Sequence, residues 1–539
     1  MHGLRELAQA GNGRGDTPRR RVADGGGATV TILPTNDGHV AISPREPHQW
    51  VAWLEVMGNP AWGEDPRFAE QEGRVRHWDQ LHGLLSDWSR TRDKESIAAS
   101  AQAAHVPSFP LRTPTEHLHS KQLAQRGFFE SASLDGVDVR LPSLPFGLTT
   151  QTGELMHLPP ASLPLDGIRV LDFSWVIAGP TCTRYLAAMG ADVIKVEAPQ
   201  RPDPGRASEL HSVLGQTKRG ITLDLKQPPA VQIALDLAAR SDIVIENFAT
   251  GVMDRLGIGA DALRQVNPNL ILVSASGLGR TGPEADRVAY GTLLQCYTGF
   301  AALNGHPDTP PRVGMAWLDP MCGLMLALIA TAAVYERLTT GRIHRVDFSM
   351  VEAMLWTMSE PLIRAQLGLP VEARGNASEE YAPHGVYAAQ GDDAWLSVAV
   401  RDDADWAALR EIVSGLDQLG PLDAVERREH TVKIEQVLGK WTRARSPDKA
   451  ADALQARGVP AAAVVGASSL VEDAHLAARG FWQESAGTTK LPGLPWQTTL
   501  PLRATPAPSL GADTDIVLAD VLGLDENTLR RLREAGAFG

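Results

Sequence analysis

Two similar segments, separated by a long segment found once, constrain the fold of this chain more than any other feature. Residues 37–50 (DGHVAISPREPHQW) and 393–406 (DAWLSVAVRDDADW) share an alternating apolar run of strand type, an arginine and a tryptophan at identical spacing. Further matches are 353 residues apart (441 − 88): Trp88 and Trp441, Gln102 and Gln455, Val106 and Val459, Arg126 and Arg479. This shared register predicts two copies of one small α+β module; the alternative is two unrelated segments of similar composition.

The segment between the two copies alternates β and α patterns. Strands are expected over 168–173, 192–196, 242–245 and 270–274, with helices such as 183–189 and 230–239 between them. This order predicts an α/β fold, with a doubly wound parallel sheet in a large domain, a smaller α+β domain after it and an extra copy of the small domain before it. The expected parts are a disordered N-terminus (1–34), the first small module (35–147), a Pro-rich linker (148–164), the large domain (165–375), the second small module (376–504) and a tail returning to the large domain (505–539).

Composition excludes several classes of protein. Lys and Arg number 51 against 64 Asp and Glu, a net charge of −13, which argues against general binding to nucleic acid or to a membrane surface. The three cysteines form no C-x-x-C pair, so no disulfide framework or structural zinc site is expected, and a reducing cytoplasm is the simplest location. The longest mostly apolar run, 321–335, is too short to span a bilayer and is interpreted as a buried helix.

Three motifs each have a structural and a chemical interpretation. Residues 277–282 (GLGRTG) fit G-x-G-x-x-G, but Pro283 follows and several strands precede them, so a turn is favoured over a dinucleotide site. His117 and His119 are assigned to a helix surface, and no metal site is predicted. Asp319 begins the most apolar helix; it is interpreted either as an N-cap or as a functional carboxylate that uses the helix N-terminus.

The large unit resembles the family III CoA-transferases (the CaiB/BaiF family). The resemblance covers 165–539 and rests on motifs in order: 165–173 (LDGIRVLDF), 178–180 (AGP), 190–197 (GADVIKVE), 218–219 (KR), 223–226 (LDLK), 246–248 (ENF), 251–257 (GVMDRLG), 276–283 (SGLGRTGP), Asp319 and 341–347 (GRIHRVD). It implies two chains interlocked as rings in a homodimer, acyl-CoA and carboxylic acid substrates, and coenzyme A as a substrate rather than a permanently bound cofactor.

The resemblance also implies roles for individual residues. The aspartate matching Asp319 is the nucleophile, which forms an acyl-aspartyl anhydride and then an aspartyl-CoA thioester. In the family, the positions matching Lys226 and Arg255 contact the CoA phosphates. The positions matching Val176, Leu223 and Asn247 line the path of the nucleotide and pantetheine. Tyr290 resembles a tyrosine that lies near the thioester. The plain alternatives are surface charge for Lys226 and core packing for Leu223 and Val176.

Departures from the family pattern bear on the substrate. Formyl-CoA transferases have a glutamine where this chain has Ile177, and a glycine-rich loop where this chain has 377–383 (ASEEYAP). Both differences favour a bulkier, more apolar acyl group as the substrate of this chain. An α-methylacyl-CoA racemase is an alternative, but its Gly-His-Asp histidine is absent from 288–291 (VAYG). A non-catalytic CoA-binding protein is the other alternative.

The first small module has no large domain of its own. It is expected to be a remnant without a catalytic group, which either takes the place of a partner's small domain or docks outside. A chain starting near Leu158 is accordingly expected to keep its activity.

Overall fold

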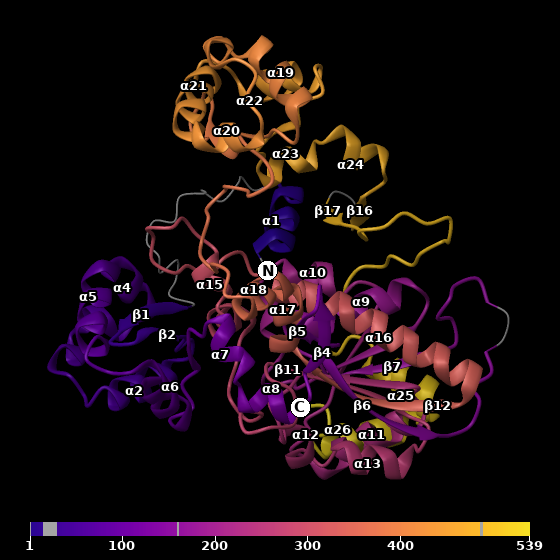
Figure 1. Cartoon of the computed structure of the whole chain (residues 1–539). Helices are drawn as coiled ribbons and strands as arrows, with labels where there is room; N and C mark the ends of the chain where they lie inside the picture. Colours follow the sequence, from indigo (N-terminus) through magenta and orange to yellow (C-terminus); the bar gives the residue numbers. More distant parts are fainter. Residues whose placement is uncertain (1, 14–29, 159–160, 486–488) are drawn as a thin grey trace.

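A seven-stranded sheet organises the computed structural model, which describes residues 2–13, 30–158, 161–485 and 489–539 (Figure 1). Its order is β6-β12-β11-β10-β7-β8-β9. Six strands are parallel: β7 (Arg169–Asp172), β8 (Asp192–Glu197), β9 (Arg219–Thr222), β10 (Ile243–Glu246), β11 (Ile271–Ser276) and β12 (Arg342–Ser349). The predicted parallel sheet is therefore confirmed for these strands, and their order is the doubly wound one, with its switch point between β7 and β10.

The seventh strand comes from outside the predicted large domain. β6 (Phe146–Thr152) pairs antiparallel with β12, from Phe146 opposite Phe348 to Thr152 opposite Arg342. The prediction of a linker over 148–164 is thus wrong for 148–152. This edge strand is exposed over the four successive residues 147–150, so it tolerates the polar sequence FGLTTQT, which does not have the apolar pattern of a central strand.

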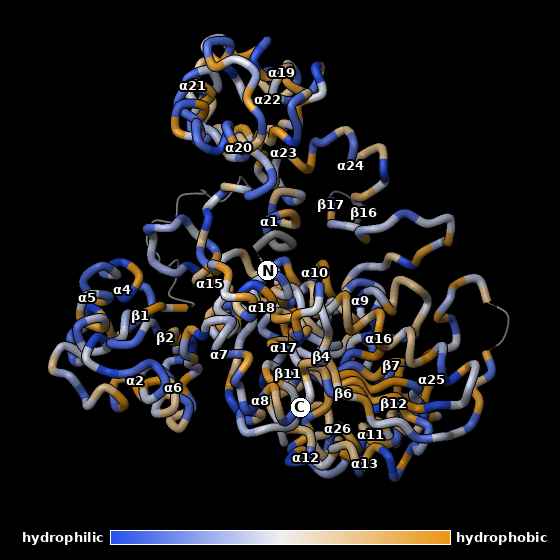
Figure 2. The backbone as a smooth tube through the Cα atoms, viewed as in Figure 1, coloured by the Kyte–Doolittle hydropathy of each residue, from blue (hydrophilic) through white to orange (hydrophobic). Residues whose placement is uncertain are grey.

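Helices cover both faces of the sheet and enclose an apolar centre (Figure 2). One layer includes α9 (Ala178–Ala188), α14 (Gly291–Tyr297), α16 (Leu318–Thr340) and α17 (Met350–Thr357). The other includes α11 (Pro228–Ala239), α13 (Ala260–Val266), α25 (Thr514–Leu522) and α26 (Glu526–Glu534), so the C-terminal tail packs on the large unit. The remaining helices of this unit are α10 (Leu210–Leu214), α12 (Val252–Arg255), α15 (Phe300–Leu303) and α18 (Ser359–Gln366).

Helix α16 is more exposed than the sequence predicts. Leu326 and Ala330 are buried, but Leu324, Leu328 and Tyr335 form an exposed apolar stripe, with Leu328 71% exposed. The prediction of a buried helix is therefore right for one face only. By length and composition α16 could also cross a membrane, but it packs against α9 as the core helix of a domain does.

The N-terminal segment has a sheet and core of its own. Strands β1 (Thr31–Thr35), β2 (Gly38–Ile42) and β3 (Ser108–Pro110) are antiparallel, and β4 (Phe129–Leu134) pairs with β5 (Val137–Pro142). Its helices are α2 (Pro47–Val56), α3 (Pro66–Ala69), α4 (Gln71–Arg76), α5 (Trp78–Ser89), α6 (Lys94–Ala103), α7 (Pro114–Leu118) and α8 (Lys121–Gln125).

The segment after the large unit has elements in a matching order. Its strands are β13 (His384–Ala388), β14 (Trp395–Ala399), β15 (Ala461–Ala463), β16 (Trp482–Ser485) and β17 (Thr489–Pro492). Its helices are α19 (Asp403–Ile412), α20 (Ala424–Glu429), α21 (Thr431–Arg443), α22 (Pro447–Gln455), α23 (Ala467–Val471) and α24 (Ala474–Ala478). Several bounds fall at the spacings seen in the sequence: α19 begins and ends 356 residues after α2 (403 − 47), and β15 lies 353 after β3 (461 − 108).

The N-terminus itself is partly helical. The predicted disorder over 1–34 is wrong for α1 (His2–Gly11) and for the start of β1, while 14–29 lie outside the described residues. Ala8 of α1 is fully buried in a cluster with Ile177, Val213 and Leu491, and this burial gives the short helix a tertiary reason to form.

The N-terminal segment is joined to the large unit by buried polar contacts. The Arg126 guanidinium forms ion pairs with Asp347 and Glu352, and its side chain is 3% exposed. Gln122 donates to the carbonyl oxygens of Leu278 and Thr281 at 2.8 Å. Residues 277–282 do form a turn, in which Gly279 has a φ of 85° and leaves room for Arg126: a Cβ there would lie 2.2 Å from the guanidinium.

His117 differs from its prediction as a surface residue. Its side chain is fully buried, and Nε2 lies 2.9 Å from the carbonyl oxygen of Tyr297. Burial lowers the pKa of His117 to about 4, so the ring is neutral at physiological pH.

A buried ion pair below the sheet's carboxyl edge gives a stability prediction. Burial alone would raise the pKa of Asp172, but Lys195 and Lys218, with hydrogen bonds from Ser174 and Thr183, hold it at about 2. Asp172→Asn should therefore lower the free energy of unfolding by about 3–5 kcal/mol, because it leaves Lys218 buried without its carboxylate. Urea unfolding followed by tryptophan fluorescence measures this loss.

A surface carboxylate in the same sheet provides the control. Asp192 pairs with Arg169 and Arg219 and is 31% exposed, so Asp192→Asn should cost less than about 1 kcal/mol. The stabilisation by Asp172 is present above about pH 4 and should be lost as the pH falls toward 2, because its folded-state pKa lies below the unfolded value. Equal losses in the two variants would contradict the assignment.

Candidate active site

The candidate site lies at the switch point of the sheet, outside the carboxyl ends of β7 and β10. Crevices at this point are the usual ligand sites of doubly wound folds. Asn247, directly after β10, bridges the crevice: its side-chain oxygen accepts from the Trp175 N–H at 2.6 Å, and its Nδ2 donates to the Trp175 carbonyl at 2.9 Å. The amide of Asn247 therefore holds the loop that follows β7.

That loop has an unusual backbone. Val176 has a φ of 64°, a left-handed conformation that costs a β-branched residue about 1–3 kcal/mol. Its N–H donates to the carboxylate of Asp203 at 3.0 Å, and Lys195 contacts the carbonyl of Ser174. These contacts, with those of Asn247, fix the loop in front of the first turn of α9.

Asp319 lies where three helices begin. It is the second residue of α16, and a Cβ added to Gly291, the first residue of α14, would lie 2.0 Å from its Oδ2. A Cβ on Gly323, one turn into α16, would lie 2.6 Å from the carbonyl oxygen of Ala178, the first residue of α9. The glycines thus let α14 and α9 each approach the start of α16, and Asp319 lies in the first turn of that helix.

The N-cap interpretation of Asp319 is wrong. The N-cap of α16 is Trp317, and no side chain makes a capping hydrogen bond there. Asp319 lies two positions further on, in the first turn, where a helix dipole favours negative charge. Its carboxylate is thus not used to cap the helix.

Burial is the largest influence on the electrostatics of Asp319, and one of the smaller influences is a cation from the N-terminal segment. Burial raises the pKa of Asp319, and the charge of Arg45 acts in the opposite direction. The Arg45 guanidinium carbon lies 4.1 Å from the centroid of the Tyr290 ring, and Nη2 donates to Thr292 Oγ1 at 3.1 Å. Tyr290, predicted near the thioester, is thus stacked beneath a cation next to Asp319.

The other predicted CoA residues are divided between the surface and the core. Lys226 and Arg255 are exposed and follow β9 and β10, at the same edge of the sheet as Val176 and Asn247. Neither forms an ion pair with another residue that the structure describes. Leu223 is only 1% exposed and packs in the core, so its side chain does not line a ligand path in this structure.

Sequence analysis missed Arg45 and Gly291 as site residues. The sequence shows Arg45 only as one of the residues shared by the two similar segments. Its contacts with Tyr290 and Thr292 join positions more than 240 residues apart, so they cannot be predicted from local sequence. A signal did exist: at the position four residues after the arginine, the first of the two similar segments has Gln49 where the second has Asp405.

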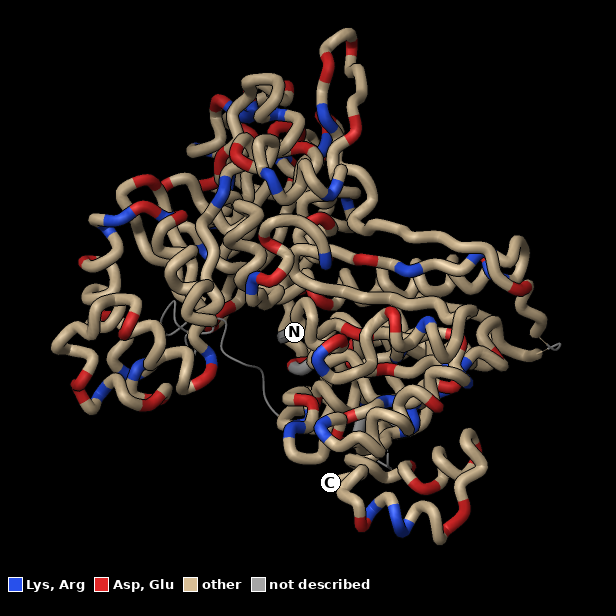
Figure 3. Tube along the Cα trace, turned by 90° about the horizontal axis from the view of Figure 1, so that it is seen from below, with Lys and Arg blue, Asp and Glu red and all other residues tan. Residues whose placement is uncertain are grey.

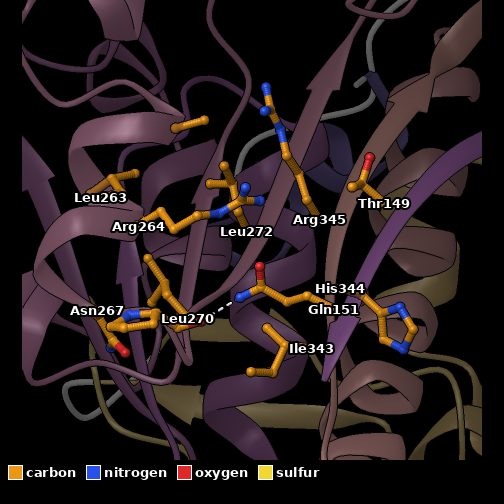
Figure 4. Close-up of a pocket in the computed structure, with 12 residues that line it drawn as sticks. Thr149, Gln151, Leu263, Arg264, Asn267, Leu270, Leu272, Ile343, His344 and Arg345 are labelled. Atoms are coloured by element: carbon orange, nitrogen blue, oxygen red, sulfur yellow. Dashed lines mark hydrogen bonds between the residues drawn. The ribbon is translucent and has the colours of Figure 1, made fainter. Parts of the chain in front are cut away.

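Other surface features carry less chemistry. The pocket in Figure 4 lies between α13 and the β6–β12 edge, lined by residues such as Thr149, Gln151, Arg264 and His344, and none of the predicted site residues lines it. Lys and Arg are interspersed with Asp and Glu along the described chain (Figure 3). Among the described residues, no three His, Cys, Asp or Glu side chains gather as a metal site would require.

Comparison with known proteins gives a consistent family. The model of CoA-transferase family III matches residues 5–162 and 165–514. A succinyl-CoA--D-citramalate CoA-transferase of Chloroflexus aurantiacus is 32% identical over 69% of this chain and 97% of its own length. A formyl-CoA:oxalate CoA-transferase of Rhodopseudomonas palustris has the same identity and coverage, and a probable CoA-transferase of Mycobacterium tuberculosis is 28% identical over 94% of this chain and 70% of its own length.

A solved structure agrees with these relatives. A CaiB/BaiF family protein from Brucella suis superposes with a TM-score of 0.62 at 26% identity, over 67% of this chain and the whole of that one. The match over most of the chain, together with a doubly wound sheet that carries an aspartate at its helix-lined carboxyl edge, identifies the chain as a member of CoA-transferase family III.

Proposed function

We propose that this chain moves CoA from an acyl-CoA to a carboxylic acid, with Asp319 as the nucleophile. The observation that carries the proposal is the carboxylate of Asp319 at the converging starts of α9, α14 and α16, close beside the Cβ-free Gly291. Burial raises its pKa and weakens its solvation, which makes the ionised carboxylate a better nucleophile.

The reaction has two matching halves. The carboxylate of Asp319 attacks the thioester carbonyl, and the tetrahedral intermediate expels CoA as a thiolate, which leaves an acyl-aspartyl anhydride. The thiolate then attacks the aspartyl carbonyl, which releases the donor acid and leaves an aspartyl-CoA thioester. The acceptor carboxylate attacks this thioester to give a second anhydride and free thiolate, and the thiolate attacks the acceptor's acyl carbonyl, restoring Asp319. Each step exchanges one acyl bond for another, so the thioester energy is retained.

The helix starts around Asp319 suit this chemistry. Each carbonyl addition places negative charge on an oxygen, and the N–H groups and dipoles of helix first turns stabilise such charge. The fixed loop at 174–177 supports a path for the CoA chain, because Val176 and Asn247 hold its backbone in one conformation. The proposal also includes an acyl group that is bulkier and more apolar than those of the formyl-CoA transferases.

A screen of acyl-CoA donors against carboxylic acids, read by mass spectrometry, tests the reaction class. Succinyl-CoA and formyl-CoA are rational first donors, since relatives are named for them. New acyl-CoA formed in proportion to acceptor supports transfer. Exchange of the α-proton in deuterated water without a change of acid would instead support a racemase, and CoA binding without turnover a non-catalytic protein.

Lys226 and Arg255 are proposed to meet the CoA phosphates. Lys226→Ala and Arg255→Ala should each weaken CoA binding about tenfold or more, because a charge-assisted phosphate contact contributes about 1.5–3 kcal/mol. Isothermal titration with CoA measures the dissociation constant. Arg264→Ala, at the pocket of Figure 4, is the matched control and should leave it unchanged; unchanged values in both test variants would show that these cations are ordinary surface charge.

The proposal extends to the organisation of the chain. We infer that 35–147 and 376–504 descend from one small domain. Several of their helices and strands begin at the spacings seen in the sequence, and the family model that matches 165–514 also matches 5–162. Since one copy packs on the large unit through Arg126 and Gln122, it is proposed to take the place of a partner's small domain. The interlocked homodimer stays a prediction, for which the mass in solution is the measurement.

A further inference from the structure

The two proposed copies of the small domain differ at one informative position. In the second copy, Arg401 forms an ion pair with Asp405, from Nε to Oδ2 at 2.8 Å, and its side chain is 53% exposed. In the first copy, the matching residues are Arg45 and Gln49. The backbone contact is retained, because Gln49 Oε1 accepts from the Arg45 N–H at 2.9 Å just as Asp405 Oδ2 accepts from the Arg401 N–H at 3.0 Å.

The first copy has the amide Gln49 where the second has the acid Asp405, and this difference changes the position of the arginine side chain. Gln49 is neutral and does not hold the Arg45 side chain, which instead crosses to the large unit. There the guanidinium stacks on Tyr290 and donates from Nη2 to Thr292. The charge that the second copy neutralises with its own Asp405 is thus delivered, in the first copy, to the surroundings of Asp319.

Part of the donor capacity of Arg45 remains unused. Its Nε donates to Ser43 Oγ at 3.3 Å and Nη2 to Thr292, while Nη1 donates to no other residue in the described part of the chain. Arg45 is not within ion-pair distance of Asp319, yet its charge acts on the pKa of that carboxylate. The guanidinium therefore faces the reaction centre without being neutralised by it.

The proposed reaction needs a cation here. In the proposed sequence the acceptor carboxylate attacks when Asp319 is a neutral CoA thioester, so the charge of the acceptor must enter a poorly solvated site, and a buried carboxylate without a counter-charge is costly. A guanidinium binds a carboxylate with two parallel hydrogen bonds, and one stacked on an aromatic ring is already oriented.

We propose that Arg45, supplied by the N-terminal segment, receives the carboxylate of the acid substrate beside Asp319 and so determines the preference for carboxylic acid acceptors. This rests on the proposed CoA transfer. It assigns to the first small-domain copy a substrate contact, contrary to the expectation that this copy is a remnant without a functional group.

Steady-state kinetics with a carboxylic acid acceptor provides the test. Arg45→Gln should raise the KM for the acid about ten- to a hundredfold, while the KM for acyl-CoA changes far less. Arg401→Gln is the matched control in the second copy and should change neither. Arg45→Lys, which retains the charge but not the fork, should recover part of the loss.

A second pair of variants separates charge from packing. Gln49→Asp should recreate the Arg401–Asp405 ion pair and draw the Arg45 guanidinium away from Asp319. It should therefore raise the KM for the acid as Arg45→Gln does. Gln49→Asn, in which the new side chain has the size of aspartate but no charge, should raise this KM far less. The acid limb of kcat/KM should move to higher pH in Arg45→Gln, because loss of the cation raises the pKa of Asp319 further.

The outcomes distinguish this inference from the proposed function. A normal KM for the acid in Arg45→Gln, with Asp319 still required for turnover, would overturn the role of Arg45 alone. Equal effects of Gln49→Asp and Gln49→Asn would also overturn it, because packing and not charge would then be responsible. Turnover that does not need Asp319 would instead reject the reaction on which the inference rests.

Discussion

Asp319→Ala should abolish CoA transfer and leave the fold intact. Without the carboxylate neither the anhydride nor the aspartyl thioester can form, so kcat should fall by at least about a thousandfold. Stability should not fall, because the N-cap of α16 is Trp317 and the side chain of Asp319 makes no capping bond. Removal of a buried charge can even raise the urea midpoint, since burial disfavours the ionised form.

Covalent trapping gives the same test a positive readout. Hydroxylamine added during turnover should convert the thioester or anhydride to a hydroxamate, found by mass spectrometry on the peptide containing Asp319. Asp286→Asn, an exposed carboxylate before Tyr290, is the matched control and should retain full activity. A hydroxamate on another residue, or full turnover by Asp319→Ala, would reject the assignment.

Gly291→Ala offers a graded version of this experiment. The added Cβ would lie 2.0 Å from Oδ2 of Asp319, so either the carboxylate or the start of α14 must move. Activity should then fall with little change in CoA affinity, since the predicted phosphate contacts Lys226 and Arg255 lie elsewhere on the sheet edge.

The sequence predicts the central sheet well because its strands are strongly apolar. The runs at β7, β8, β10 and β11 are buried on both faces and are rich in Val, Ile and Leu, a pattern that is readable without the structure even though β8 also buries Lys195 and Glu197. Edge strand β6 has no such pattern: Leu148 is exposed, and its pairing with β12 is decided nearly two hundred residues away. Its place in the sheet could not be read from local sequence.

The sequence predicts which residue types belong to the candidate site but not how the site is assembled. Asp319, Asn247 and Tyr290 belong to motifs, and such motifs identify residue types without saying what surrounds them. The contacts of Arg45 and Arg126 with the large unit depend on how the N-terminal segment docks, which is a tertiary property. His117 illustrates the same limit, since a polar helix residue was assigned to the surface and lies buried against Tyr297.

The docking of the N-terminal segment reverses one expectation from the sequence. A chain starting near Leu158 would lack β6 and therefore expose the edge of β12. It would also lack Phe109, Leu123 and Phe128, which belong to the same buried cluster as the helices around Asp319. Glu352, 3% exposed, would remain without the guanidinium that pairs with it.

Deletion of residues 1–157 should therefore abolish activity and yield a poorly folded chain, because it removes a sheet strand, part of the core and the partner of a buried carboxylate. Co-expression of 1–157 with 158–539 should restore both folding and turnover, since the lost surface is supplied in trans. Activity and size-exclusion profiles of the two preparations are the measurements. A folded, fully active 158–539 chain would contradict the prediction.

Arg126→Leu tests the same docking without removing the segment. It should lower the free energy of unfolding by about 3–5 kcal/mol, because Asp347 and Glu352 lose a buried counter-charge. It should also make the N-terminal segment easier to release by limited proteolysis. Arg479→Leu, at the matching position of the second copy, is the control: Arg479 is exposed, so stability should change by less than about 0.5 kcal/mol. If both variants behaved alike, the Arg126 contacts would not hold the segment in place, and its contribution to the site through Arg45 would need another explanation.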